Sequence, residues 1–63
     1  MNRNDIIDLL TVIAAGDRRT VGNTDVDFWA NIVGDIPKDL ALEAVRRHFR
    51  ERPGVWLEPG HIV

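Results

Sequence analysis

Residues 38–52 carry the most regular pattern of this 63-residue chain, and that pattern limits the fold more than any other feature. Core-side positions recur there every three or four residues, which is the period of an α-helix with one buried face. They are Ala41, Leu42, Val45, His48 and Phe49. Charged residues fill the other side, where Glu43 and Arg47 have the spacing of an i,i+4 ion pair. Because Pro53 and Gly54 end the pattern, we expect a helix over 38–52 that needs partners to cover its apolar face.

A first partner is predicted over residues 4–15, where the apolar side chains have the same period. They are Ile6, Ile7, Leu10, Ile13 and Ala14. Asn4 is suited to be the N-cap of this helix, and Gly16 stands where a C-terminal glycine belongs.

A second partner is predicted over residues 25–33. Its apolar face consists of Val26, Trp29, Ile32 and Val33. Thr24 and Asp27 have the spacing of a capping box, and Gly34 closes the helix. The residues between the three predicted helices, 17–23 and 35–37, are read as connectors.

The chain therefore predicts an all-α fold, a compact three-helix bundle that forms a single domain over residues 1–63. Residues 55–57 are apolar and are expected to fold back on the bundle, and Pro59 suits the first turn of a fourth helix. Since the chain ends one turn later, we expect it to be the N-terminal part of a longer protein. The predicted core consists of Ile6, Leu10, Ile13, Trp29, Ile32, Leu42, Val45, Phe49 and Trp56.

The residue inventory argues against an enzyme. The chain has no Cys, Ser or Tyr, which removes disulfides, thiolate metal sites and the commonest side-chain nucleophiles. Thr24 is better explained as a cap, and Lys38 as the solvated start of a helix. A domain of this size also buries only about 60% of the surface of its unfolded chain, which leaves little room for a deep substrate cleft. We predict no catalytic residues and no cofactor.

The two histidines do not have the spacing of a metal site. His48 and His61 are thirteen positions apart, the chain has no Cys, and it contains no His-x-x-x-His pair and no Asp-x-Asp-x-Asp loop. We therefore predict no metal ligands. His48 flanks the apolar side of the 38–52 helix, so it is expected to be hydrogen-bonded and partly buried.

Charge is divided unevenly along the chain. Residues 1–45 hold four basic and eight acidic side chains, a balance of −4, whereas residues 46–63 hold four arginines and two glutamates, a balance of +2. Three of these arginines, Arg46, Arg47 and Arg50, lie on the predicted solvent side of the 38–52 helix. They are candidates for contact with a partner, and the alternative is that they form an ordinary solvated face.

Three apolar residues, Val12, Phe28 and Leu40, lie outside the main stripes of their predicted helices. Either the small bundle buries some helices on two sides, or these residues form an exposed patch for a partner protein. On the second reading Phe28 and Leu40 join the three arginines as predicted partner-binding residues. A homodimer in which the apolar residues outside the stripes face each other is a further alternative, and the oligomeric state is left open.

A DNA-binding alternative comes from the short Gly34–Pro37 turn between two predicted helices, which is compatible with a helix-turn-helix. In that motif the N-terminal part of the second helix meets the bases, and here that part offers only Lys38 beside Asp39. The net charge of −2 also weakens non-specific phosphate binding. A small regulator that uses the arginine end of the 38–52 helix is therefore the runner-up, with weak DNA binding.

Six short motifs, taken in chain order, carry a resemblance over residues 4–63. They are Asp5–Leu10 with Ile13, Asp17–Arg19, Asp25-Val26 with Trp29, Ile36-Pro37, Ala41 with Ala44-Val45 and His48-Phe49, and Trp56-Leu57 with Pro59 and His61-Ile62. In this order the chain resembles a group of small proteins encoded by phages and prophages of actinobacteria. It is similar, more distantly, to the N-terminal domain of the phage family that loads and inhibits replicative helicases.

The resemblance implies an all-helical adaptor without an active site, followed in relatives by a more flexible tail. Such loaders bind the replicative helicase of the phage or its host, restrain its ATPase and unwinding activities, and deliver it to an initiator at the origin. The family supplies no catalytic residue to carry over. The positions that match its core-like pattern are Trp29, Ala44, Val45, Phe49, Trp56 and Ile62.

No apolar stretch of the chain reaches the length of a signal-peptide core or of a membrane span, since Asp8 interrupts the first apolar run. We therefore expect no contact with a membrane and a location in the cytoplasm, which the resemblance implies is that of a bacterial host.

Overall fold

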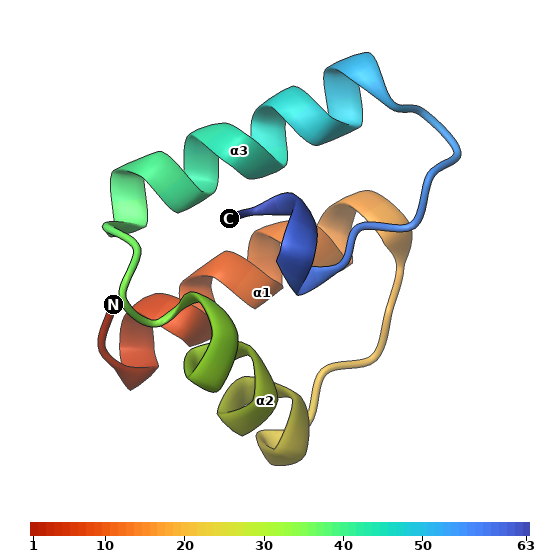
Figure 1. The fold of residues 1–63 in the computed structure, drawn as a ribbon. Coiled ribbons are helices and arrows are strands. Elements are labelled where there is room, and N and C mark those ends of the chain that lie inside the picture. Colours follow the sequence, from red (N-terminus) through yellow and green to blue (C-terminus); the bar gives the residue numbers. More distant parts are fainter.

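The computed structural model describes all residues from Met1 to Val63. It contains three α-helices, α1 (Arg3–Asp17), α2 (Asn23–Val33) and α3 (Lys38–Glu51), followed by one 3₁₀ turn, η1 (Pro59–His61), and no strand (Figure 1). The predicted all-α fold is thus confirmed. The expected start of a fourth helix at Pro59 takes the form of η1.

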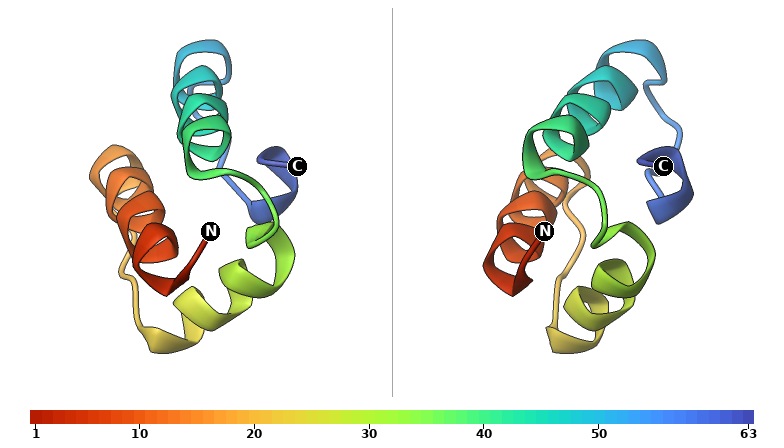
Figure 2. Two further views of the ribbon diagram at one scale, coloured as in Figure 1. Left: turned by 90° about the vertical axis from the view of Figure 1, so that its left-hand side faces the viewer. Right: turned by 60° about the vertical axis from the view of Figure 1, so that its left-hand side comes forward.

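The helices surround the core as an open triangle that the C-terminal segment completes. Lys38, at the start of α3, lies beside Asp8 of α1, and Phe49 near the end of α3 lies against Gly16 near the end of α1, so these two helices run in the same direction. The chain makes this arrangement possible by crossing between them through α2. Figure 2 shows η1 on the side of the bundle opposite α1, where it packs on α2. The last nine residues are therefore part of the fold.

Helix α1 begins one residue earlier than predicted and helix α2 two residues earlier, because other residues cap them. In α1 the Asn2 side chain accepts a hydrogen bond from the Asp5 N–H (2.8 Å), and the Asp5 carboxylate accepts one from the Asn2 N–H (3.2 Å). Asn2 rather than Asn4 is therefore the N-cap. In α2 the Asp25 carboxylate accepts a hydrogen bond from the Gly22 N–H (2.8 Å), which replaces the predicted Thr24 cap.

The end of α1 also differs from the prediction. Gly16 lies inside the helix, and Arg18 takes the left-handed conformation (φ 63°) at its end, with its N–H bonded to the Ala14 carbonyl (2.7 Å). Gly16 has a different function. A Cβ atom there would lie 2.7 Å from the Phe49 ring, so the missing side chain allows α3 to approach α1.

Eleven apolar residues form the buried core. They are Ile6, Leu9, Leu10, Ile13, Val26, Trp29, Val33, Ala41, Val45, Leu57 and Ile62. Five of the nine predicted core residues belong to this set, and two more, Leu42 and Phe49, are partly buried against it. Every helix and the C-terminal segment contribute buried residues, so the core forms only where all of them pack together.

Two core predictions, Ile32 and Trp56, are wrong. Helix α2 turns Val26, Trp29 and Val33 inward, which leaves Ile32 exposed on the side of the helix that carries Phe28. In the C-terminal segment Leu57 enters the core completely, while the adjacent Trp56 points outward and stays 54% exposed. Ile7, predicted on the buried stripe of the first helix, is exposed as well.

No helix combines the length and the apolar character that crossing a bilayer requires.

Replacing Leu57 with Ala tests the structural role of the C-terminal segment. Its side chain is fully buried, so Leu57→Ala should lower the free energy of unfolding by about 2–5 kcal/mol. The matched control is Leu40→Ala, which truncates an exposed leucine and should change this free energy by about 0.5 kcal/mol or less. Urea titrations followed by circular dichroism measure both, and equal effects of the two changes would contradict the docked segment.

Candidate functional site

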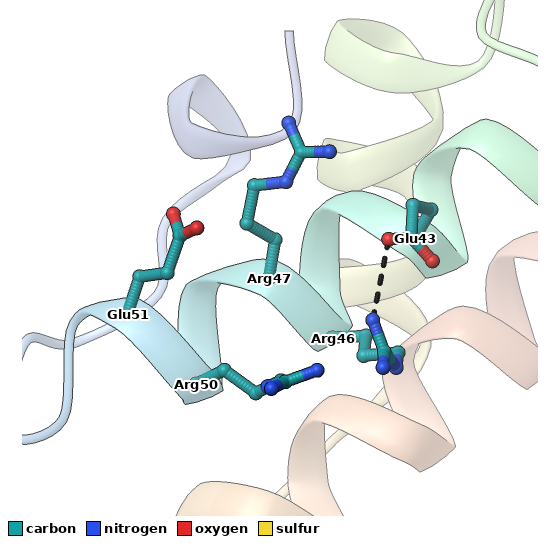
Figure 3. A pocket seen from close by; sticks show the side chains of 5 residues that line it. All are labelled: Glu43, Arg46, Arg47, Arg50 and Glu51. Atoms are coloured by element: carbon teal, nitrogen blue, oxygen red, sulfur yellow. Dashed lines mark hydrogen bonds and ion pairs between the residues drawn. The ribbon is translucent and has the colours of Figure 1, made fainter.

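The predicted arginines meet two glutamates on the solvent side of α3. Glu43, Arg46, Arg47, Arg50 and Glu51 together line a shallow hollow of about 380 Å³, which we call the arginine face (Figure 3). All five residues belong to α3 and lie on one side of it, because positions three, four and seven residues apart along a helix share a side. The helix itself is held by its buried side, so the backbone of the arginine face is rigid.

Few of these charges neutralise one another. Glu43 pairs with Arg46 (3.4 Å) and not with Arg47, so the predicted i,i+4 pair does not form. Arg47 and Arg50 have no carboxylate within ion-pair distance. An exposed Arg–Glu pair of this kind is worth little, and the Arg46 guanidinium is therefore also available to a partner.

The side chains of the arginine face spread outward and do not converge. Figure 3 shows Arg47 and Glu51 pointing toward the side of the C-terminal turn, whereas Arg46 and Arg50 point toward α1. A site for a small ligand needs polar groups that meet at one point. This arrangement suits a broad surface contact better.

The two predicted apolar anchors lie in different places. Leu40 is 60% exposed in the first turn of α3, seven residues before Arg47 and so on the same side of the helix, about 10 Å away along its axis. Phe28 is 56% exposed but belongs to α2, which lies across the bundle from α3 (Figure 1). Leu40 therefore lies on the helix of the arginine face, whereas Phe28 lies on a different helix. Val12 is exposed on α1.

Sequence reasoning missed a junction at Arg19, which fastens the C-terminal segment to the bundle. The Arg19 Nε lies 3.0 Å from Oδ1 and 2.9 Å from Oδ2 of Asp17, and both side chains are only 12% exposed. The same guanidinium donates a hydrogen bond to the Leu57 carbonyl (2.7 Å) and lies 4.2 Å from the centre of the Trp56 ring. These four residues, Asp17, Arg19, Trp56 and Leu57, form what we call the Arg19 junction.

The junction changes the acidity of its carboxylate. The side-chain hydrogen bond from Arg19 lowers the pKa of Asp17, against the opposing effect of burial, because it favours the charged carboxylate. At the other end of α1 the hydrogen bond to Asp8, together with the charge of Asp5, raises the pKa of Lys38. Lys38 is thus ion-paired at the start of α3 and is not simply solvated.

His48 provides a second fastening for the C-terminal segment. Its ring is buried, and Nε2 donates a hydrogen bond to the Val55 carbonyl (2.7 Å), while Nδ1 has no partner. The ring centre lies 4.7 Å from that of His61, whose Nδ1 accepts a hydrogen bond from the Glu58 N–H (2.9 Å). The predicted hydrogen bond of His48 is confirmed, and its burial is more complete than predicted. Nowhere in the structure do three or more His, Cys, Asp or Glu side chains lie together as a metal site would need.

The comparisons with known proteins add no relative. No family model, no curated protein and no solved structure matches the chain. The resemblance to phage helicase loaders therefore stays a prediction.

Replacing Asp17 with Asn tests the Arg19 junction through its dependence on pH. Because the pKa of Asp17 is lower in the folded protein than in the unfolded chain, its ionised form stabilises the fold fully at pH values above the ordinary value of about 3.8. This contribution is lost as the pH falls through the lowered pKa. The free energies of unfolding of the wild type and Asp17→Asn should therefore differ most at neutral pH, and the difference should shrink below about pH 4.

Thermal unfolding followed between about pH 2.5 and 7 measures this difference. Asp35→Asn, which removes an exposed carboxylate with no ion pair, is the control. A difference between wild type and Asp17→Asn that stays constant across this range would contradict the junction.

Proposed function

We propose that this protein is a binding module that contacts another protein through the arginine face and Leu40. The observation that carries the proposal is the combination of Arg47 and Arg50, which have no ion-pair partner, with an exposed leucine on the same side of one rigid helix. Interfaces are enriched in arginine, and an apolar side chain beside it can be desolvated by a partner. A helix that is already folded also loses little conformational entropy when it binds.

The mixture of charges favours a protein over a nucleic acid as the partner. Three arginines and two glutamates give the arginine face a net charge of only +1. Phosphate binding draws its affinity from the cations that replace counterions, and Glu43 and Glu51 oppose it there. A protein surface can match both signs of charge, because it presents carboxylates and cations side by side.

The resemblance described above suggests which partner to test first. On this proposal the protein is a phage or prophage replication accessory protein, which acts in the host cytoplasm by loading or inhibiting a replicative DNA helicase. Binding alone would then be its mechanism. The contact would combine the apolar Leu40 side chain with ion pairs formed by the arginines farther along the same helix.

The direct test is binding of the purified chain to a purified bacterial replicative helicase, measured by biolayer interferometry. The double variant Arg46→Ala/Arg47→Ala should weaken the complex at least about tenfold, which corresponds to about 1.4 kcal/mol, and Leu40→Ala should weaken it as well. Arg3→Ala is the matched control, because it removes an exposed arginine from a different helix.

Circular dichroism should show that all variants keep the helical fold, since the changed residues are exposed. The proposal fails if the wild type binds no helicase from phage or host, or if the α3 variants bind as tightly as Arg3→Ala. Binding by the chain and a measurable loss of ATPase activity would support an inhibitory role.

The unpaired Arg47 and Arg50 also favour a second candidate, the small DNA-binding regulator. It requires an affinity for duplex DNA that falls as salt rises, with the slope of log affinity against log salt reduced by about 1 for each arginine removed. Fluorescence anisotropy with a labelled duplex at low salt, using the wild type and Arg47→Ala, measures that slope. Absence of binding at high micromolar protein would exclude this candidate.

A further inference from the structure

A second hollow lies away from the arginine face, where the ends of α1 and α3 meet the loop that follows α3. Its volume is about 390 Å³, and the residues that line it include Gly16, Asp17, Phe49, Pro53, Val55 and Trp56. Figure 1 shows this loop descending from the end of α3 past the end of α1. We call this hollow the Trp56 cleft.

The walls of the Trp56 cleft carry three large apolar side chains, those of Phe49, Val55 and Trp56, and are open to solvent. Trp56 is 54% exposed and Val55 is exposed beside it, while Phe49 is partly buried against the core. Gly16 adds no side chain, and so leaves the floor of the cleft to the Phe49 ring. Exposed apolar surface that is gathered in a hollow is typical of a site that receives an apolar side chain.

The cleft is formed before any ligand arrives. Gly54 takes a positive φ of 82° that turns the loop, and the Val55 N–H bonds to the Arg52 carbonyl (3.2 Å). His48 holds the Val55 carbonyl from inside, and the Arg19 guanidinium supports the Trp56 ring. These hydrogen bonds and the contact with Arg19 therefore fix the shape of the loop. Binding would then require little ordering of the protein.

The charges around the cleft determine what kind of partner fits. The one carboxylate in its wall, Asp17, is already bound by Arg19. The residues next along the chain from the wall, Arg18 after Asp17 and Arg52 before Pro53, are exposed arginines with no ion pair. A partly apolar hollow whose lining residues have unpaired, exposed arginines as chain neighbours is complementary to an apolar side chain flanked by carboxylates.

We propose that the Trp56 cleft, with Arg18 and Arg52 next to its lining residues in the chain, binds a short acidic peptide segment of a partner protein through one apolar or aromatic anchor residue. The anchor packs between Trp56, Val55 and Phe49, and acidic residues on either side of it pair with the two arginines. This surface is separate from the arginine face, and the inference does not depend on the partner proposed for that face.

The test uses the synthetic peptide acetyl-Glu-Asp-Leu-Phe-Asp-Glu-amide, which contains no tryptophan, so that binding can be followed by the fluorescence of the protein and by calorimetry. One control peptide has Lys in place of each acidic residue, and a second has Ser in place of Leu and Phe. We expect the acidic apolar peptide to bind with a Kd on the order of 100 µM, and both controls to bind at least about tenfold more weakly. Raising the salt from about 0.05 M to 0.5 M should weaken its binding.

Charge reversal in the protein provides the matched comparison. Arg18→Glu/Arg52→Glu should weaken binding of the acidic peptide at least about tenfold, whereas Arg3→Glu, an exposed arginine at the other end of α1, should leave it unchanged. Trp56→Ala should abolish binding. Because that change also removes the contact with Arg19, Val55→Asp serves as a second variant, and the amide NMR spectrum of each protein shows whether it is folded.

Three results would overturn the proposal. The first is no binding of the acidic peptide at about 1 mM, which would mean an affinity too weak for a specific site. The second is equal binding of the acidic and the Lys peptides, since it would show that Arg18 and Arg52 do not select acidic residues. The third is binding of single-stranded oligothymidine more tightly than the peptide, because bases stacking on Trp56 would then explain the cleft better.

Discussion

The packing of the C-terminal segment against the three helices is the constraint on which the rest of this structure depends. Three helices alone leave their common apolar side open, and Leu57 and Ile62 of the C-terminal segment close it. That segment is mostly irregular, so few of its backbone groups can satisfy one another. Arg19 and His48 bind its carbonyls from the bundle side, and Asp17 keeps the Arg19 guanidinium in place. Buried polar groups thus hold the C-terminal segment in the position where its apolar side chains complete the core.

The parts of the fold that could be predicted from the sequence are those that a helical period determines. The three helices, their order and core residues such as Ile6, Leu10 and Val45 follow from that period. The exact helix caps do not follow from the period. Asn2 and Asn4 both suit an N-cap, and only the hydrogen bonds with Asp5 decide between them. The sequence also could not tell which of Trp56 and Leu57 is buried, since no period applies in an irregular segment and the contacts of Arg19 with the Trp56 ring and the Leu57 carbonyl form only in the fold.

The same distinction holds for the candidate sites. The arginine face is visible in the sequence because its residues share one side of a predictable helix. The Trp56 cleft is not, since it joins residues from three parts of the chain that meet only in the fold. Both surfaces lie on a body whose core spans every element, so a partner would meet them in a fixed relative position. Two such surfaces, if both bind as proposed, would allow the protein to connect two segments of a partner or two partners.

The central claim is that the C-terminal segment is a fixed part of the fold, because the core, the Arg19 junction and the Trp56 cleft all require it. Amide hydrogen exchange measured by NMR tests this most directly. The N–H groups of Val55, His61 and Ile62 donate to the carbonyls of Arg52, Glu58 and Pro59. We predict that the Ile62 amide exchanges at least about 100-fold more slowly than in an unfolded peptide, as do amides of α3 such as that of Val45. Exchange of Ile62 at the rate of an unfolded peptide, while Val45 stays protected, would contradict the account.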